Sequence, residues 1–404
     1  MLSVAEAVAK VVSGFAPLAV ETIGVGDALG RALAEDVAAR LDSPPLDVSA
    51  MDGYAVRAAD ATVAAARLAL IGVSSAGHPF PGSIGPGQCV RIFTGAAVPA
   101  GADAIVIQED TTAEGDVVTV NEAPRPGRWI RRAGMDFRRG DVMLRAGRRL
   151  TGRDIGLAAA MNVPWLSVRR QPRVAILATG DELVMPGDPL AEGQIVGSNG
   201  LAVAAYVTAF GGLPVLLGTA ADDEDSLRRY LAGACGADLL VTIGGASVGD
   251  LDLVRQVLAD QGFDLGFYRV AMRPGKPLIF GRLGDVPVLG LPGNPVSAGV
   301  TSLLFLRPAI RAMLGLGDRQ EPLPMAWLGR DLPANDHRQD YLRSRLTVSD
   351  DGRHVATPFE TQDSALMARF AEADCLVVRP PNAPPARAGD RVAIVPLDAD
   401  GIFV

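Results

Sequence analysis

Cysteine and histidine are both scarce in this chain of 404 residues, with three of each. Cys89, Cys235 and Cys375 lie far apart and form no Cys-x-x-Cys pair, so we expect no disulfide framework, as suits a reducing compartment. The histidines are equally scattered, which argues against a Cys/His zinc site and against a histidine-based catalytic triad. We therefore expect the chemistry to depend on carboxylates, a lysine, backbone amides and a hard metal ion.

The chain also lacks an excess of positive charge and an uninterrupted apolar segment. Its net charge of −8 argues against a general nucleic-acid binder, so local donors must hold any anionic ligand. Residues 195–221 and 286–306 carry no charge and are long enough to cross a membrane, but glycine and proline interrupt both. We interpret them as buried strand–loop–helix segments. The N-terminus opens on a capping box, Ser3 to Glu6, and shows no secretory signal, so we expect a cytoplasmic protein with no membrane contact.

Residues 170–315 alternate between strand-like and helix-like segments. Such alternation predicts βαβ units and a parallel sheet. The first helix is expected from Leu201, Ala204, Ala205 and Thr208, which recur at helical spacing. The expected strands are 173–178, 214–218, 238–243 and 286–291, and a second helix is expected at 296–313.

The remaining segments indicate further domains, and the length alone predicts two to four. Residues 46–137 are rich in glycine, proline and short β-type runs. Helical patterns at 27–37 and 151–160 flank this block, which suggests one domain inserted into another. Repeated strand-like runs in residues 319–404 predict a C-terminal β-barrel-like module.

Polar or glycine-rich loops follow each of the four expected strands of the α/β segment. Because the carboxyl ends of parallel strands share one edge, these loops are expected to form a ligand site. Glycines there let backbone N–H groups approach a phosphate. Each loop alone could be an ordinary turn, but four on one edge favour a phosphate-bearing ligand. Neither a P-loop nor a Rossmann fingerprint is present. The loops are 179–182, 222–223, 244–249 and 292–297.

Charged residues near these loops suggest how such a ligand is held. Lys276 is one of only two lysines among 38 basic residues, and a compact ammonium can reach a phosphate as a point charge. The alternative is that its position is coincidental. Glu182 and Asp252 fall on neighbouring loops, and paired carboxylates beside a phosphate commonly bind Mg²⁺. The alternative is that each acid merely stabilises a helix N-terminus.

Seven motifs, taken together, resemble the molybdopterin molybdenumtransferases, the MoeA/gephyrin E-domain family. The resemblance runs from the first helix to the C-terminal module. Any one motif is weak, but seven in order at family-like spacing are specific. They are S-A-M-D-G-Y-A-V (49–56), T-G-A-x-V-P (94–99), I-R-x-x-G-x-D (130–136), T-G-D-E-L (179–183), G-G-A-S-V-G-x-x-D (244–252), R-P-G-K-P (273–277) and L-P-G-N-P-V-S (291–297).

The resemblance implies an α/β multidomain fold and a homodimer. A central α/β domain of the molybdopterin-binding type is combined with a linking domain, an inserted β-rich domain and a C-terminal β-barrel domain. The α/β domain is implied to comprise residues 1–19 and 169–318, and the linking domain residues 20–45 and 138–168. The inserted domain is implied at 46–137 and the C-terminal barrel at 319–404. The resemblance further implies an elongated dimer in which Asp52, from the inserted domain, completes the site of the other subunit.

The resemblance also implies a reaction, the insertion of molybdate into adenylylated molybdopterin with Mg²⁺, giving molybdenum cofactor and AMP. Molybdopterin adenylyltransferase and cofactor-accepting enzymes are implied partners. Arg273 stands where many members carry lysine, and Ser364 lies in a turn that matches only loosely. The implied catalytic residues are Asp52, Asp136, Asp252 and Lys276; the metal ligands are Glu182 and Asp252; the substrate-binding residues are Thr94, Thr179, Gly180, Asp222, Gly244, Gly245, Ser247, Arg273, Pro292 and Gly293.

Two other functions remain as alternatives. One is a molybdopterin adenylyltransferase, which has a related α/β domain but lacks the inserted block. The other is a non-catalytic scaffold of gephyrin type that binds a pterin or a peptide. The presence of Asp52, Asp136, Asp252 and Lys276 counts against a purely structural role.

Overall fold

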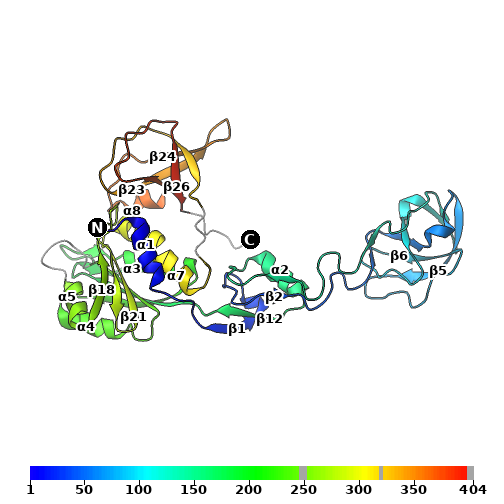
Figure 1. The fold of residues 1–404 in the computed structure, drawn as a ribbon, viewed down its shortest axis with the longest axis horizontal. Helices are drawn as coiled ribbons and strands as arrows, with labels where there is room; N and C mark the ends of the chain where they lie inside the picture. Colours follow the sequence, from blue (N-terminus) through cyan, green and yellow to red (C-terminus); the bar gives the residue numbers. More distant parts are fainter. Residues whose placement is uncertain (245–252, 318–321, 398–404) are drawn as a thin grey trace.

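The computed structural model describes residues 1–244, 253–317 and 322–397, with the backbone alone for 253–255. The molecule is elongated, with the α/β part and the C-terminal barrel at one end and the sheet of β5 and β6 at the other (Figure 1). A slender connecting part lies between them. Among the described helices, none has the length and apolar character needed to span a bilayer.

A six-stranded sheet forms the centre of the α/β part. In the order given below, the first four strands are parallel to one another. The fifth strand pairs antiparallel with both the fourth and the sixth. The expected strands are therefore confirmed, as is the parallel sheet. The order is β16 (Leu213–Ala220), β13 (Arg173–Thr179), β17 (Leu239–Ile243), β21 (Val286–Leu291), β20 (Ile279–Leu283) and β18 (Phe263–Tyr268).

Helices cover both faces of this sheet because its strands are apolar on both sides. On β13, Val174 and Ile176 belong to one core cluster, whereas Ala175 and Leu177 belong to the other. The capping box at Ser3 is confirmed and begins the helix that joins the first cluster. That cluster includes α1 (Val4–Ser13), α3 (Asn199–Phe210), α6 (Pro295–Thr301) and α7 (Arg307–Met313); the second includes α4 (Glu224–Ala232) and α5 (Leu253–Asp260).

The helix expected near residue 201 is confirmed, but most of the residues whose spacing predicted it lie on its exposed side. Leu201 is 44% exposed, and Ala205 and Thr208 are also exposed. Val203 and Val207 are buried instead, because they and not Leu201 face the sheet. The helix expected at 296–313 is also present; α6 and α7 are joined through a π-helical turn, η4 (Ser302–Leu306).

The connecting part shows where the sequence analysis was wrong. Residues 27–37 were expected to be helical, but Gly30 has a φ of +74° and the segment is extended or turned. Its backbone N–H groups bond to distant carbonyls: Gly30 to Leu150 and Leu33 to Arg148. The expected helix at 151–160 is present as α2. The elements are β1 (Val20–Gly24) paired with β12 (Trp165–Arg169), β2 (Val37–Ala38) paired with β11 (Val142–Leu144), η1 (Val25–Asp27) and α2 (Gly152–Ala160).

The β-rich block between these elements forms a sheet with its own core. Buried residues such as Val56, Leu68 and Val118 pack within it. Two short strands, β3 (Val48–Ser49) and β10 (Ile130–Arg131), pair where the chain enters and leaves. The sheet order is β7 (Ala104–Ile107), β4 (Gly53–Val56), β6 (Gln88–Ile92), β5 (Ala66–Ser74), β9 (Val117–Val120) and β8 (Thr111–Glu114), with η2 (Ala58–Asp60) and η3 (Gln108–Asp110) between strands.

The C-terminal module is a closed β-barrel, as expected. Closure comes from the pairing of its longest strand, β23, with both β24 and β25. A short strand of the α/β part, β19 (Met272–Arg273), pairs in parallel with β23 and docks the two parts together. The barrel consists of β23 (Gln339–Val348), β24 (His354–Pro358), β22 (Met325–Leu328), β26 (Arg391–Pro396) and β25 (Cys375–Arg379), with the short helix α8 (Met367–Ala371).

Candidate functional site

The loops that follow β13, β17 and β21 meet closely at the carboxyl edge of the parallel strands. Gly244 has a φ of +95°, and a Cβ there would lie 2.9 Å from the carbonyl oxygen of Thr179. A Cβ on Gly293 would lie 3.6 Å from the Cα of Gly244. The structure therefore brings together five predicted substrate-binding residues on adjacent loops: Thr179, Gly180, Gly244, Pro292 and Gly293. Glycine at 244 is required both by its backbone conformation and by this close approach.

A buried hydroxyl adds to this edge. Thr179 is 5% exposed, and its Oγ1 has no hydrogen-bond partner in the described part of the chain. Buried hydroxyls in proteins normally have a partner, so an unsatisfied one beside an open glycine loop is a feature of ligand sites. This hydroxyl would lie 3.0 Å from a Cβ on Gly244.

Three carboxylates lie together beside these loops. The backbone N–H of Asp222 donates to Oδ1 of Asp181 at 2.9 Å. Partial burial raises the pKa of the Asp222 carboxyl, and the negative charges of Asp181 and Glu182 raise it further. Asp222 and Glu182 are thus brought close, as predicted, while Asp181 was missed although it lies inside the T-G-D-E-L motif. Repulsion among the three would be relieved by a bound cation.

Of the two predicted metal ligands, Glu182 is described by the structure and Asp252 is not. Asp252, Gly245 and Ser247 lie outside the described residues. Within the described residues, no three His, Cys, Asp or Glu side chains are arranged to hold a metal ion. Glu182 and its neighbours supply the oxygen donors that Mg²⁺ prefers, but Asp252 or substrate phosphates would have to complete its coordination.

Lys276 ends a tight loop that connects β19 to β20. Gly275 has a φ of +101°, and a Cβ there would lie 2.6 Å from Cγ2 of Thr301. The backbone carbonyl of Lys276 accepts a hydrogen bond of 3.0 Å from the N–H of Val270. The side chain is half-buried, and no described residue forms an ion pair with its ammonium.

Arg273, in contrast, is engaged by the barrel. Its Nε donates to Oδ1 of Asp340 at 2.9 Å, and its Nη2 donates to Oδ2 at 3.4 Å. The same Nη2 lies 3.3 Å from Oδ2 of Asp336. The predicted substrate contact of Arg273 stays a prediction, and the structure assigns its guanidinium these two carboxylates.

The barrel also reaches the loop after β21. The side-chain amide of Asn294 donates to Oγ of Ser364 at 2.9 Å, and the N–H of Val296 donates to the carbonyl of Ser364 at 3.1 Å. Arg343 is buried beside this turn and donates from Nη2 to the carbonyl of Asp363. The loose motif match at residues 361–364 was the only sequence signal for these contacts.

The predicted residues of the insert form a second group. The backbone N–H and the hydroxyl of Thr94 donate to Oδ1 of Asp52, at 2.7 and 2.8 Å. These bonds lower the pKa of the exposed Asp52 carboxyl. Arg91 lies nearby and stacks over Phe93, with its guanidinium carbon 4.9 Å from the ring centroid. The sequence motifs containing Asp52 and Thr94 thus form one polar site.

Within a single chain this group is remote from the carboxyl edge. Asp52 directly precedes β4, and the sheet of β4, β5 and β6 lies at the far end of the molecule from β21 (Figure 1). Asp136 is exposed where the insert joins the connecting part, and its N–H donates to the carbonyl of Ser43. The predicted residues are therefore separated into an edge group, an insert group and Asp136 between them.

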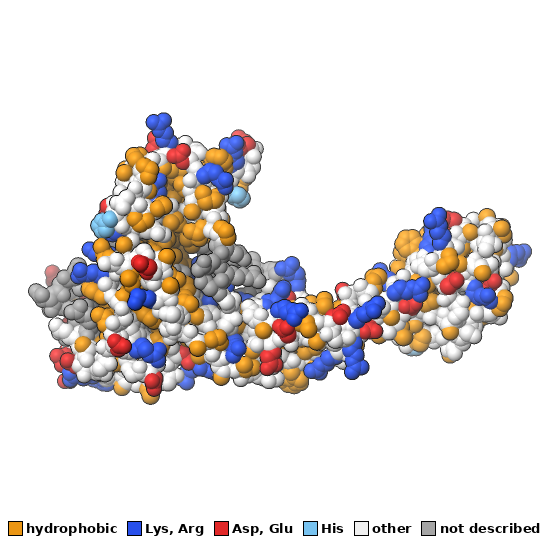
Figure 2. All heavy atoms as spheres, in the orientation of Figure 1, with side chains coloured by type: hydrophobic (Ala, Val, Ile, Leu, Met, Phe, Trp, Pro, Cys, Tyr) orange, Lys and Arg blue, Asp and Glu red, His pale blue; other side chains and the backbone are white. Residues whose placement is uncertain are grey.

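The described residues on one face of the molecule form no large patch of a single charge. Acidic and basic side chains are interspersed over the face shown in Figure 2. An anionic ligand would therefore be held by the local donors described above and not by a general attraction.

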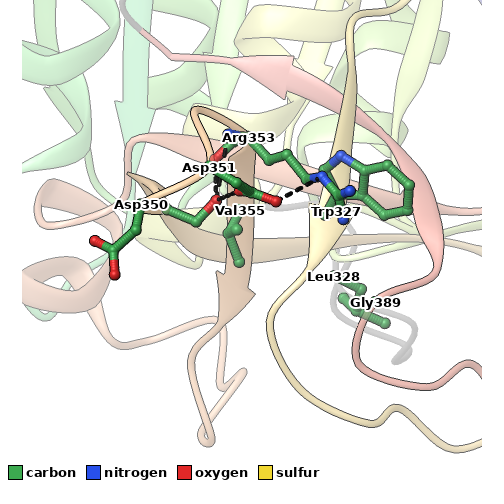
Figure 3. A pocket seen from close by; sticks show the side chains of 8 residues that line it. Trp327, Leu328, Asp350, Asp351, Arg353, Val355 and Gly389 are labelled. Atoms are coloured by element: carbon green, nitrogen blue, oxygen red, sulfur yellow. Dashed lines mark hydrogen bonds and ion pairs between the residues drawn. The ribbon is translucent and has the colours of Figure 1, made fainter.

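A shallow hollow of about 460 Å³ lies on the barrel, away from the predicted residues. Figure 3 shows Arg353 lying across Trp327, 4.7 Å from the centroid of the ring, with its Nε paired to Asp351 at 2.9 Å. Asp351 already pairs with Arg353, and no predicted site residue lines this hollow, so the carboxyl edge of the sheet remains the candidate site.

Comparisons with known proteins cover nearly the whole chain. Residues 2–162 match the MoeA N-terminal region (domain I and II), residues 175–312 match a probable molybdopterin binding domain, and residues 326–397 match the MoeA C-terminal region (domain IV). A molybdopterin molybdenumtransferase from Haemophilus influenzae is 35% identical over 95% of both chains. One from Nostoc is 37% identical, covering 89% of this chain and 85% of its own.

Solved structures agree with this result. Two structures of a molybdopterin biosynthesis MoeA protein from Pyrococcus horikoshii are 30% and 27% identical to this chain. Each alignment covers 98% of this chain and 99% of the other, with TM-scores of 0.84 and 0.83. The similarity thus includes the insert and the barrel as well as the α/β part.

Proposed function

The chain belongs to the molybdopterin molybdenumtransferase family of the MoeA type, and from this premise we propose that it inserts molybdate into adenylylated molybdopterin, releasing AMP and forming molybdenum cofactor. It is a transferase of molybdenum cofactor biosynthesis. The observation that carries the proposed reaction is the carboxyl edge, where closely packed glycine loops, clustered carboxylates and a lysine with no ion-pair partner among the described residues lie on neighbouring loops.

The residues of the edge suit a substrate with a pyrophosphate link. Gly244 and Gly293 allow the loops after β13, β17 and β21 to pack closely at the edge, and glycine-rich backbone of this kind can bring N–H groups to a phosphate. Lys276 would offset the negative charge that develops on the leaving AMP phosphate. Partial burial and the charges of Asp181 and Glu182 raise the pKa of Asp222, so its carboxyl is suited to hold a proton near the exchanging oxygens.

A divalent cation fits the carboxylate group, and we propose Mg²⁺ held by Glu182 and Asp252. Mutual repulsion around Asp222 supports a cation there, because the bound charge would offset it. When bound, Mg²⁺ would neutralise and orient the phosphate oxygens. The acids themselves keep the ion beside the glycine loops, while Lys276 remains available to the substrate.

The separation of the insert from the edge supports a homodimer with composite sites. Asp52 and Thr94 lie beside strands β4 and β6 of the insert, whose sheet is at the opposite end of the molecule from the α/β part that contains Lys276 (Figure 1). We propose that the insert of one subunit, residues 46–137, completes the carboxyl-edge site of the other subunit. The other domain boundaries are proposed to be those expected from the sequence. The protein is proposed to act in the cytoplasm, receiving its substrate from a molybdopterin adenylyltransferase and passing cofactor to accepting enzymes.

One assay separates this function from the alternatives. The protein is incubated with adenylylated molybdopterin, molybdate and Mg²⁺, and AMP is measured by HPLC. AMP release that requires molybdate supports the proposal. An adenylyltransferase would instead consume ATP and molybdopterin, and a scaffold would bind the pterin without releasing AMP; either result rejects it. The matched N-terminal and C-terminal regions already favour the transferase over a single-domain adenylyltransferase.

A further inference from the structure

We propose that Arg273 is a positioning residue for Lys276 and does not bind the substrate: its ion pair with Asp340 fastens the loop that presents Lys276 to the C-terminal barrel. The inference rests on the proposed function, because Lys276 is taken to act on the substrate phosphates. It makes the barrel part of the active-site architecture without placing a barrel side chain on the reacting atoms.

The first support is the geometry of the ion pair. Nε and Nη2 of Arg273 both donate to Asp340, one to each carboxylate oxygen, and Nη2 also approaches Asp336. The carboxylate of Asp340 is only 9% exposed, whereas the arginine side chain is 47% exposed. A two-point contact of this kind fixes orientation as well as distance.

The second support is the backbone around the pair. Arg273 and Asp340 are direct partners in the register of β19 and β23, and the N–H of Gln339 donates to the carbonyl of Ala271 at 2.9 Å. Only Pro274 and Gly275 separate Arg273 from Lys276. The connection is short and closely packed, since a Cβ on Gly275 would lie 2.6 Å from Cγ2 of Thr301, so the placement of Arg273 restricts where Lys276 can lie.

The third support is electrostatic. Two carboxylates neutralise the guanidinium, so it contributes little net positive charge to a phosphate. Asp336 is held as a carboxylate by Arg338, whose hydrogen bonds keep its pKa well below the usual range, with Arg273 lowering it further. Turning Arg273 towards a substrate would leave Asp340 charged and largely buried without its partner, which is costly. Lys276 has no such competing partner among the described residues.

The lysine content of the chain provides a test that does not depend on activity. Lys10 is the only other lysine of the chain. It is exposed and lies far from Lys276 in the sequence. The full-length protein is labelled briefly with acetic anhydride, and the ratio of Lys276 to Lys10 acetylation is measured by peptide mass spectrometry. Arg273→Ala and Asp340→Asn are each expected to change this ratio at least threefold. An unchanged ratio in both variants would overturn the proposal.

Kinetics of AMP release provide the second readout. Each variant should lower kcat about tenfold and leave KM for adenylylated molybdopterin within about threefold. The kcat of the double variant should be no lower than that of the less active single variant. In a Lys276→Ala background, neither substitution should lower kcat further. Arg273→Lys should recover part of kcat, because lysine can make one of the two contacts.

A matched control is the pair of Arg170 and Asp238, a bidentate ion pair at the amino edge of the same sheet, with distances of 2.8 and 2.7 Å. Arg170→Ala should lower the Tm to a similar degree but change neither the labelling ratio nor kcat. If Arg273→Ala raises KM more than tenfold while Asp340→Asn changes nothing, Arg273 is a substrate ligand and the proposal is wrong. If the wild type releases no AMP but the labelling ratio still changes, the proposed function fails and the positioning role stands.

Discussion

Ser364 of the barrel accepts a hydrogen bond of 2.9 Å from the side-chain amide of Asn294, at the N-terminus of α6 in the α/β part. Asn294 belongs to the loop after β21, and the side-chain amide of Asn199 donates to Gly293 in the same loop. The loop is therefore fixed from two sides, by α3 and by the barrel. The barrel contacts two of the edge loops, this one through Ser364 and the loop of Lys276 through Asp340.

The contact between Gly299 of α6 and Phe370 of α8 packs the C-terminal module against the α/β part and can be tested by overpacking. A Cβ on Gly299 would lie 2.3 Å from Cε1 of Phe370, which is 7% exposed. Gly299→Ala should force α8 away from α6, destabilise the protein by about 1–3 kcal/mol in thermal unfolding, and reduce AMP release. In a Phe370→Ala background the ring is absent, so the same substitution should cost almost nothing. Equal costs in both backgrounds would contradict this packing.

The proposed metal ligands can be tested by Mg²⁺ dependence. Glu182→Ala and Asp252→Ala should each raise the Mg²⁺ concentration needed for half-maximal AMP release about tenfold or more, because each removes a charged oxygen ligand. The Tm should change little, since Glu182 is exposed. Full activity with an unchanged Mg²⁺ requirement in both variants would reject the assignment.

Replacing Asp222 by asparagine should raise the stability of the protein and lower its activity. Its folded-state pKa lies above the ordinary value, so the folded chain binds more protons than the unfolded chain. Its contribution to stability therefore falls as the pH rises from the ordinary pKa through the raised one, and the penalty is complete above the raised pKa. Asp222→Asn should raise the Tm at pH 7 by about 1 °C while lowering AMP release. The Tm difference should shrink as the pH approaches 4; an Asn variant less stable at pH 7 contradicts the prediction.

Lys276 should be needed for rate. Lys276→Ala should lower kcat about a hundredfold, because a charge-stabilising donor is removed. Lys276→Arg should recover only part of this loss, since the guanidinium is larger and planar. The measurement is AMP release at saturating substrate, with Lys10→Ala as the control. A fully active Lys276→Ala variant would show that the lysine is incidental.

Composite sites can be tested with mixed dimers. Asp52→Ala and Lys276→Ala subunits, each inactive alone, are unfolded, mixed and refolded, and the heterodimers are purified with two affinity tags. If Asp52 acts on the site of the other subunit, each heterodimer has one intact site and one with both lesions, so about half the wild-type AMP release returns. If Asp52 acts within its own chain, every site has one lesion. Verified heterodimers without activity would therefore reject the composite model.

Local sequence was sufficient for the elements that depend on local patterns. The strands of the parallel sheet, the capping box at Ser3 and the α2 helix were all predicted, because apolar runs, alternation and capping residues act over a few positions. The loops containing Thr179, Gly244 and Gly293 could also be grouped from the sequence, because each follows a predicted strand. Parallel strands necessarily place their carboxyl ends at one edge.

Tertiary structure decided what depends on partners distant in sequence. Residues 27–37 have a helical pattern, but Gly30 and Leu33 donate their backbone N–H groups to the carbonyls of Leu150 and Arg148, and this pairing replaces the bonds of a helix. The same reason separates Arg273 from Lys276, three residues apart: one meets Asp340 of the barrel, whereas the other has no described ion-pair partner. Residue type and spacing determined the chemistry that this chain can perform, but only the packing of the barrel against the sheet decided which charges remain available for it.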